Sequence, residues 1–213
     1  MTTLDLFAED RTALALDPGA ILLGGFALPD ASALLADIAD IVSAAPFRQL
    51  ETPGGRTMSV AMTNCGVLGW TSDRRGYRYV PDDPAGARPW PAMPERLRDL
   101  AERAAGAAGF AGFAPDACLV NRYAPGTRMG LHQDKDETAE APIVSVSLGV
   151  SATFLWGGAT RSDRPRRIRL DHGDIVVWGG PARLAFHGVA PLAKGHHPET
   201  GDLRFNLTFR QVR

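Results

Sequence analysis

Cysteines, long apolar runs and excess charge are all scarce in this sequence, and each scarcity excludes a class of protein. Cys65 and Cys118 are the only cysteines, and they stand far apart and outside any C-x-x-C motif, which favours a reducing compartment over a disulfide framework. No stretch approaches the ~18 apolar residues that a membrane-spanning helix requires. The formal net charge of −1 excludes binding to nucleic acid through bulk charge, so any such binding needs local patches.

The N-terminus also lacks the marks of a secretory signal, because residues 1–10 are acidic and contain neither a basic start nor an apolar run. The length of 213 residues fits a single domain, 1–213, that can bury a core without disulfides. We therefore expect a cytoplasmic protein that does not associate with a membrane, with a monomer as the default state.

Two segments have helical periodicity. In residues 31–45 the apolar residues recur at helical spacing after Asp30, a typical N-cap residue, and Pro46 ends the pattern. A second helix is predicted after Pro94 as far as about residue 108, where Gly109 stops it. Residues 20–28 predict a short strand before the first helix. Segments 1–47 and 91–117 are thus expected to form a helical support.

The rest of the chain favours short strands separated by tight turns. Segment 48–90 alternates turn signals with strand-like runs, and 118–213 contains predicted strands at 118–123, 143–150, 153–156, 168–170, 175–178 and 203–211. The turn at 171–174 is a good hairpin signal for the two strands beside it. The predicted fold is α+β: a jelly-roll core (a double-stranded β-helix) at 118–213, bracing helices, and a β-rich insert, 48–90, over its mouth.

The last strand has two faces. Arg204, Asn206, Thr208 and Arg210 alternate with three apolar residues, so the polar set shares one side of the strand. Such a face often points to water. The alternative is that the two guanidinium groups face a pocket and hold an acid with two carboxylates.

A possible metal site begins at His132 and Asp134, which share a strand face at i and i+2. An imidazole and a carboxylate are two members of the 2-His-1-carboxylate triad that binds Fe(II) and leaves three coordination positions open. A surface turn is the simpler interpretation, since charged residues follow. The third ligand would be His172, His187, His196 or His197, and we favour His187 because it lies in an apolar run.

One ligand, a 2-oxo acid, would account for both the metal triad and the strand with two arginines. A 2-oxo acid can chelate the metal through its keto oxygen and adjacent carboxylate, and dioxygen can take the third open position. Its distal carboxylate then needs a cation, for which arginine is well suited.

Longer stretches resemble the bacterial AlkB family of Fe(II)/2-oxoglutarate-dependent dioxygenases, which dealkylate nucleobases. The resemblance runs from Leu4 to Gln211 and is carried by TPGG (52–55), MSVAMTNCG (58–66), RPWPAMP (88–94), NRYAPG (121–126), HQDKDE (132–137) and RFNLTFR (204–210).

The resemblance implies a role for each matching residue. It assigns the iron ligands to His132, Asp134 and His187. It assigns the distal carboxylate of 2-oxoglutarate to Arg204 and the C1 carboxylate to Arg210. Polar contacts to the cosubstrate fall on Asn121, Tyr123 and Asn206, and substrate contacts on Trp70, Tyr77, Arg78, Tyr79, Asp136 and Arg161.

The implied reaction is oxidative demethylation of bases such as 1-methyladenine and 3-methylcytosine in DNA. Dioxygen and 2-oxoglutarate are consumed, and succinate, carbon dioxide and formaldehyde are released. The base must be flipped out or already single-stranded, with Trp70 and His132 on its two sides and Asp136 beside the cationic ring. The insert 48–90 would be the nucleotide-recognition lid.

Phosphate contacts are predicted at residues 160–169, which carry five arginines and one aspartate; Arg74, Arg75, Arg78 and Lys135 would assist them. A solvated hairpin tip is the alternative. Rival functions are a 2-oxoglutarate oxygenase acting on RNA or a small molecule, and a metal-binding jelly-roll module without catalysis.

Overall fold

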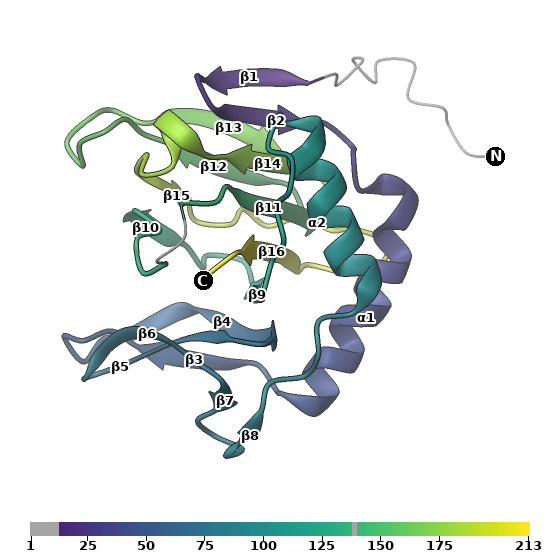
Figure 1. Cartoon of the computed structure of the whole chain (residues 1–213), viewed down its shortest axis with the longest axis vertical. Coiled ribbons are helices and arrows are strands. Elements are labelled where there is room, and N and C mark those ends of the chain that lie inside the picture. Colours follow the sequence, from purple (N-terminus) through teal and green to yellow (C-terminus); the bar gives the residue numbers. More distant parts are fainter. Residues whose placement is uncertain (1–12, 138–139) are drawn as a thin grey trace.

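A computed structural model describes residues 13–137 and 140–213. The segment 1–10, which carries the expectation about a signal, lies outside the described residues, as does the stretch near Leu4. Two antiparallel sheets face each other, and two helices cover the outer side of the larger one (Figure 1). This arrangement confirms the predicted jelly-roll core with supporting helices.

The larger sheet has eight strands in the order β1-β2-β14-β11-β16-β9-β4-β3. Their bounds are Leu14–Asp17, Ala20–Leu23, Ile175–Trp178, Ile143–Gly149, Arg204–Arg210, Ala117–Tyr123, Thr57–Gly66 and Arg48–Glu51. The smaller sheet has the order β10-β15-β12-β13, with bounds Met129–His132, His187–Val189, Ala152–Trp156 and Arg166–Leu170.

Two hairpins lie beyond these sheets, β5 (Gly69–Asp73) with β6 (Gly76–Val80), and β7 (Asp82–Asp83) with β8 (Arg88–Pro89). Segment 48–90 is therefore divided between two sheets. β3 and β4 extend the large sheet through the pairing of β4 with β9, and β5 and β6 form a separate two-stranded sheet that lies beside β3 and β4 (Figure 1).

The helices are α1 (Ala31–Ala44) and α2 (Glu95–Ala107), and short 3-10 turns occupy Leu28–Asp30 and Gly180–Ala182. Both predicted helices are confirmed. Asp30 precedes α1, but its carboxylate makes no capping bond and instead accepts a bond from Arg103 Nη2 of α2 at 2.7 Å. The side chain therefore joins the two helices. No helix of the described residues is long and apolar enough to cross a membrane.

Two apolar layers hold the fold together. One lies between the helices and the outer face of the large sheet and includes Leu34, Leu97, Val146 and Leu207, all fully buried. The second lies between the two sheets. Burial of each such side chain contributes about 1.5–3 kcal/mol, so the large sheet is anchored on both faces.

Two local predictions were wrong. The strand predicted at 20–28 ends at Leu23, because Gly25 takes a left-handed φ of 65° and its N–H bonds to the Asp174 carboxylate. The turn at 171–174 does not make a hairpin: β13 pairs with β12 in the small sheet, and β14 pairs with β11 and β2 in the large one. The turn crosses between sheets, and Asp174 stabilises it by accepting the Asp171 N–H at 2.8 Å.

Candidate active site

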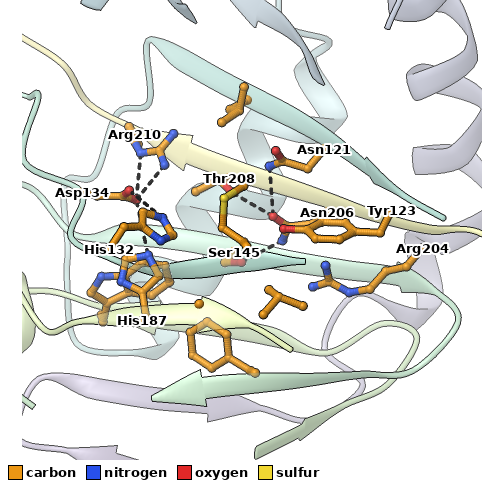
Figure 2. A pocket seen from close by; sticks show the side chains of 16 residues that line it. Asn121, Tyr123, His132, Asp134, Ser145, His187, Arg204, Asn206, Thr208 and Arg210 are labelled. Carbon is orange, nitrogen blue, oxygen red and sulfur yellow. Dashed lines mark hydrogen bonds and ion pairs between the residues drawn. The ribbon is translucent and has the colours of Figure 1, made fainter. Parts of the chain in front are cut away.

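Three metal-ligating side chains converge at the edge of the small sheet (Figure 2). His132 ends β10 and pairs in register with His187, which begins β15, and Asp134 follows two residues after His132. His132 Nε2 lies 3.5 Å from Asp134 Oδ1, and His187 Nε2 lies 3.9 Å from Asp134 Oδ2. Strand pairing thus selects His187 from the four candidate histidines.

Backbone carbonyls orient both imidazoles. His132 Nδ1 is 2.9 Å from the Gly130 carbonyl, and His187 Nδ1 is 3.0 Å from the Ala185 carbonyl. Because a carbonyl can only accept, each neutral ring carries its proton on Nδ1, and the Nε2 lone pairs are left for a metal. The residues present therefore fit a divalent metal of the kind that imidazole and carboxylate ligands hold.

The protonation states also suit a metal. Burial, helped by the nearby His132 ring, lowers the pKa of His187 to about 4, so the imidazole is neutral at pH 7. Burial raises the pKa of the Asp134 carboxyl, but Arg210 and the two histidines outweigh burial and hold this pKa well below its usual range. The triad thus includes a neutral nitrogen ligand in His187 and a carboxylate in Asp134.

Arg204 lies at the other end of the same pocket (Figure 2). Its side chain is buried, 1 % exposed, and its guanidinium lies 4.9 Å from the centre of the Tyr123 ring. Nη2 donates to Ser147 Oγ at 2.9 Å, whereas Nε and Nη1 have no hydrogen-bond partner within residues 13–137 and 140–213. Burial lowers the pKa of Arg204. A buried cation with two spare donors is a site for an anion.

A polar network joins the two ends of the pocket. Asn206 Nδ2 donates to Ser145 Oγ at 2.8 Å, and Asn206 Oδ1 accepts from Thr208 Oγ1 and from Asn121 Nδ2 at 3.0 and 3.3 Å. Asn121 Oδ1 is buried with no partner in the described chain. The polar face of β16 therefore points into a pocket between the sheets.

Arg210 lies at the metal end. Its Nη2 donates to Asp134 Oδ2 at 2.6 Å, and its Nε lies 3.2 Å from Glu137 Oε1. The direct partner of Arg210 is thus a metal-ligand carboxylate. The pocket of Figure 2 is lined by both arginines and all three metal ligands.

A second, wider pocket of about 400 Å³ adjoins the triad and is lined by Trp70, Tyr77, Asp136 and Arg161. The Trp70 and Tyr77 rings stack with centres 5.5 Å apart, and Trp70 Nε1 donates to Asp136 Oδ2 at 2.9 Å. The structure brings these four predicted substrate residues together with His132.

Two other predicted substrate residues lie elsewhere. Arg78 makes a bidentate pair with Asp73, at 2.9 and 2.7 Å, and does not line the pocket. Tyr79 donates its hydroxyl to Glu137 Oε1 at 2.5 Å. Arg78 therefore joins β6 to β5, and Tyr79 joins β6 to the segment that follows Asp134.

The arginine-rich segment 160–169 lies beside this pocket through Arg161. Arg166 pairs with Asp17 and Arg169 with Asp171. Arg161, Arg164 and Arg167 are exposed and have no ion-pair partner in the part of the chain that the structure describes.

A second cluster of possible ligands contains His172, His197 and Glu199. His172 Nδ1 accepts the Gly149 N–H at 2.9 Å, and His197 Nδ1 accepts the Glu199 N–H at 3.3 Å. Each neutral ring must then carry its proton on Nε2, the opposite of the arrangement at His132 and His187. These histidines are therefore poor metal ligands.

Sequence reasoning missed Ser147, Glu137 and Arg183. Ser147 alternates with apolar neighbours in β11, a signal for a polar inner face. Glu137 belongs to the stretch HQDKDE, where it reads as one more surface charge. Arg183 Nη1 donates to the Asp134 carbonyl at 2.5 Å, and no local pattern marks it.

Comparison with known proteins agrees with this geometry. The 2OG-Fe(II) oxygenase superfamily profile matches residues 19–210. The chain is 59 % identical over 211 residues to the alpha-ketoglutarate-dependent dioxygenase AlkB of Salmonella typhimurium, covering 98 % of each chain. It is 33 % identical to the DNA N(6)-methyladenine demethylase ALKBH1C of Arabidopsis thaliana, covering 75 % of this chain and 41 % of that protein.

A solved structure, OsALKBH1, superposes with a TM-score of 0.83 at 30 % identity and covers 94 % of this chain and 100 % of its own. The paired-histidine triad, the buried arginine and these matches lead to one conclusion: the chain belongs to the 2OG-Fe(II) oxygenase superfamily and is a dioxygenase of the AlkB type.

Proposed function

We propose that this enzyme oxidatively demethylates N-alkylated bases such as 1-methyladenine and 3-methylcytosine in DNA, acting by preference on single strands. Formaldehyde is released from the base, and 2-oxoglutarate becomes succinate and carbon dioxide. The observation that best supports this proposal is the buried Arg204 guanidinium, whose Nε and Nη1 have no hydrogen-bond partner among the described residues and which lines the same pocket as the His-Asp-His triad.

In this proposal His132, Asp134 and His187 hold Fe(II). The bound metal supplies dioxygen activation coupled to oxidation of 2-oxoglutarate. The chain itself supplies orientation: the Gly130 and Ala185 carbonyls fix the two rings, and Arg210 fixes the carboxylate.

Arg204 would take the distal carboxylate of 2-oxoglutarate, and Arg210 would lie near its C1 carboxylate. Asn121, Tyr123 and Asn206 would supply polar contacts between them. The support is their shared position on the inner faces of β9 and β16, which pair with Asn206 directly opposite Asn121.

The wider pocket would receive the flipped base. Tyr77 backs the Trp70 ring, which leaves the opposite ring face for a base, and His132 would lie beyond that base. Stacking of this kind contributes about 1–3 kcal/mol per base. One carboxylate oxygen of Asp136 accepts the hydrogen bond from Trp70. The negative charge of this carboxylate would favour a cationic methylated ring over a neutral one.

Phosphates would contact Arg161, Arg164 and Arg167, which are exposed and have no ion-pair partner among the described residues. Arg74, Arg75, Arg78 and Lys135 would add to this field, although Arg75 and Arg78 share Asp73. The β5–β6 hairpin, which carries Trp70 and Tyr77, would act as the nucleotide-recognition lid within segment 48–90.

We further propose that the protein works as a monomer in the cytoplasm, where the buried free thiols of Cys65 and Cys118 would stay reduced.

The test is formaldehyde release from an oligonucleotide with one 3-methylcytosine, at fixed iron and 2-oxoglutarate. His187→Ala should abolish release, and His196→Ala, an exposed histidine outside the triad, should leave it unchanged. Equal activity in the two variants would refute the choice of third ligand.

Substrate class is tested by comparing methylated DNA, methylated RNA and free nucleosides in the same assay. Fastest turnover of RNA or of nucleosides would replace the DNA proposal with one of its rivals. If wild-type protein forms no succinate with any of them, a metal-binding module without catalysis is the better description.

A further inference from the structure

Glu137 is the hub of a buried polar cluster beside the metal triad. Its side chain is 2 % exposed and contacts three groups: the Tyr79 hydroxyl, Arg183 Nη2 at 2.9 Å and Arg210 Nε at 3.2 Å. Burial raises the pKa of the Tyr79 hydroxyl, which therefore stays protonated and donates its bond.

Both guanidinium groups that contact Glu137 also hold Asp134, at different atoms. Arg183 Nη1 donates to the Asp134 backbone carbonyl at 2.5 Å, and Arg210 Nη2 donates to the Asp134 carboxylate at 2.6 Å. Glu137 is thus connected to the backbone and to the side chain of the same metal ligand.

Charge balance explains what Glu137 does there. Two cations, the buried Arg210 and the largely buried Arg183, face two anions with buried side chains, Asp134 and Glu137. Without the Glu137 charge, Arg210 would keep the Asp134 carboxylate as its one ion-pair partner in the described chain, and Arg183 would keep only neutral backbone carbonyls as partners. Arg210 would then compete with a metal for the Asp134 oxygens, and the excess positive charge of the two guanidinium groups would repel a divalent ion.

We propose that Glu137 is a positioning residue for the metal centre: it holds Arg183 and Arg210 so that Asp134 presents its carboxylate to the ion. Through Tyr79 it also links the β5–β6 hairpin to that ligand. The inference rests on the proposed role of Asp134 as a ligand and is independent of the nucleobase substrate.

The test measures metal affinity, so activity is not needed. Apo protein is titrated with Co(II) under anaerobic conditions by calorimetry, and the visible absorption of bound Co(II) reports the coordination geometry. Glu137→Gln, which keeps the shape and removes the charge, should weaken Co(II) binding about 10- to 100-fold and change the Co(II) spectrum. Tyr79→Phe, which removes one hydrogen bond, should have a smaller effect.

Asp83→Asn is the matched control, because Asp83 is a buried carboxylate that pairs with Arg48 and lies outside both pockets at the triad. It should lower the melting temperature and leave Co(II) affinity unchanged. If Glu137→Gln lowers the melting temperature but keeps wild-type affinity and spectrum, Glu137 is merely structural and the inference is wrong.

Should Glu137→Gln not fold, the double variant Glu137→Gln/Arg183→Met removes opposite charges together, a change that buried pairs often tolerate. It restores the charge balance but leaves Arg210 without its second anion and Asp134 without the Arg183 bond to its carbonyl. A smaller loss of affinity is therefore expected, and wild-type affinity and spectrum would overturn the inference. His187→Ala separates the two proposals: if it binds Co(II) as wild type does, the metal site itself is misassigned.

Discussion

Replacing Arg204 with methionine should separate cosubstrate binding from protein stability. The side chain has two donors, Nε and Nη1, that no described group uses, and a carboxylate of the cosubstrate can accept from both. A hydrogen bond to a charged group contributes about 1.5–3 kcal/mol. Loss of two costs roughly 3–6 kcal/mol, which raises the dissociation constant of 2-oxoglutarate about 10²- to 10⁴-fold.

The stability of the ligand-free protein should change little. Arg204→Met loses the bond to Ser147 and the cation–π contact with Tyr123, together about 3–5 kcal/mol. It also removes two unsatisfied buried donors, each of which costs about 1–3 kcal/mol. The opposing sums nearly cancel, and methionine can still pack over the ring.

The assay is calorimetric titration of the Mn(II) protein with 2-oxoglutarate without dioxygen, together with thermal melting of the apo form. Arg122→Met is the matched control, because Arg122 lies 4.8 Å from the Phe47 ring on the opposite face of β9. It should bind 2-oxoglutarate normally. Wild-type affinity in Arg204→Met would refute the assignment of Arg204 as the acid clamp.

Three further outcomes are expected. Burial lowers the pKa of His172, and His197 lowers it further, so the unfolded chain binds the proton more tightly. The stability that this group contributes is therefore present above its unfolded pKa of about 6.5 and is lost as the pH falls. The free energy of unfolding, measured with urea, should decrease less between pH 8 and pH 5.5 in His172→Asn than in wild type. Leu207→Ala should cost about 2–5 kcal/mol in the same measurement, whereas Leu28→Ala, at a site 54 % exposed, should cost far less. Changing both Arg164 and Arg167 to Gln should reduce the steepness of the plot of log affinity against log salt concentration for single-stranded DNA by roughly 1.4. An unchanged slope would show that neither residue contacts the DNA.

Periodicity predicted those elements whose apolar side chains all lie on one face. The helix at 31–45 and the strand Arg204–Arg210 each place apolar side chains on one face, and in both cases that face packs into the layer between helices and sheet. The pattern also placed Arg204 and Arg210 on a common face, and that face is buried.

Contacts between strands or residues that are far apart in the chain have no local sequence pattern that predicts them. Four histidines could complete the triad, and only the register of β10 against β15 brings His187 beside His132. The turn at 171–174 looked like a hairpin because the turn residues are the same whether the next strand joins its neighbour or crosses to the other sheet. Likewise, the partner of Arg210 is Asp134, which lies 76 positions earlier in the chain, and no local pattern joins the two.

The position of the pocket explains why its polar residues do not unfold the protein. The strands β11, β16 and β9 are central in the large sheet, and their outer faces carry Val146, Leu207 and Val120 into the fully buried layer under the helices. Several buried polar groups on their inner faces bond to one another, as Asn206 does with Ser145, which lowers the cost of burying them. The outer faces of these strands therefore supply stability while the inner faces are free to bind an acid and a metal. Of the two arginines in this pocket, Arg210 is paired with Asp134, and Arg204 has no ion-pair partner within residues 13–137 and 140–213, so its charge is left for a ligand to balance.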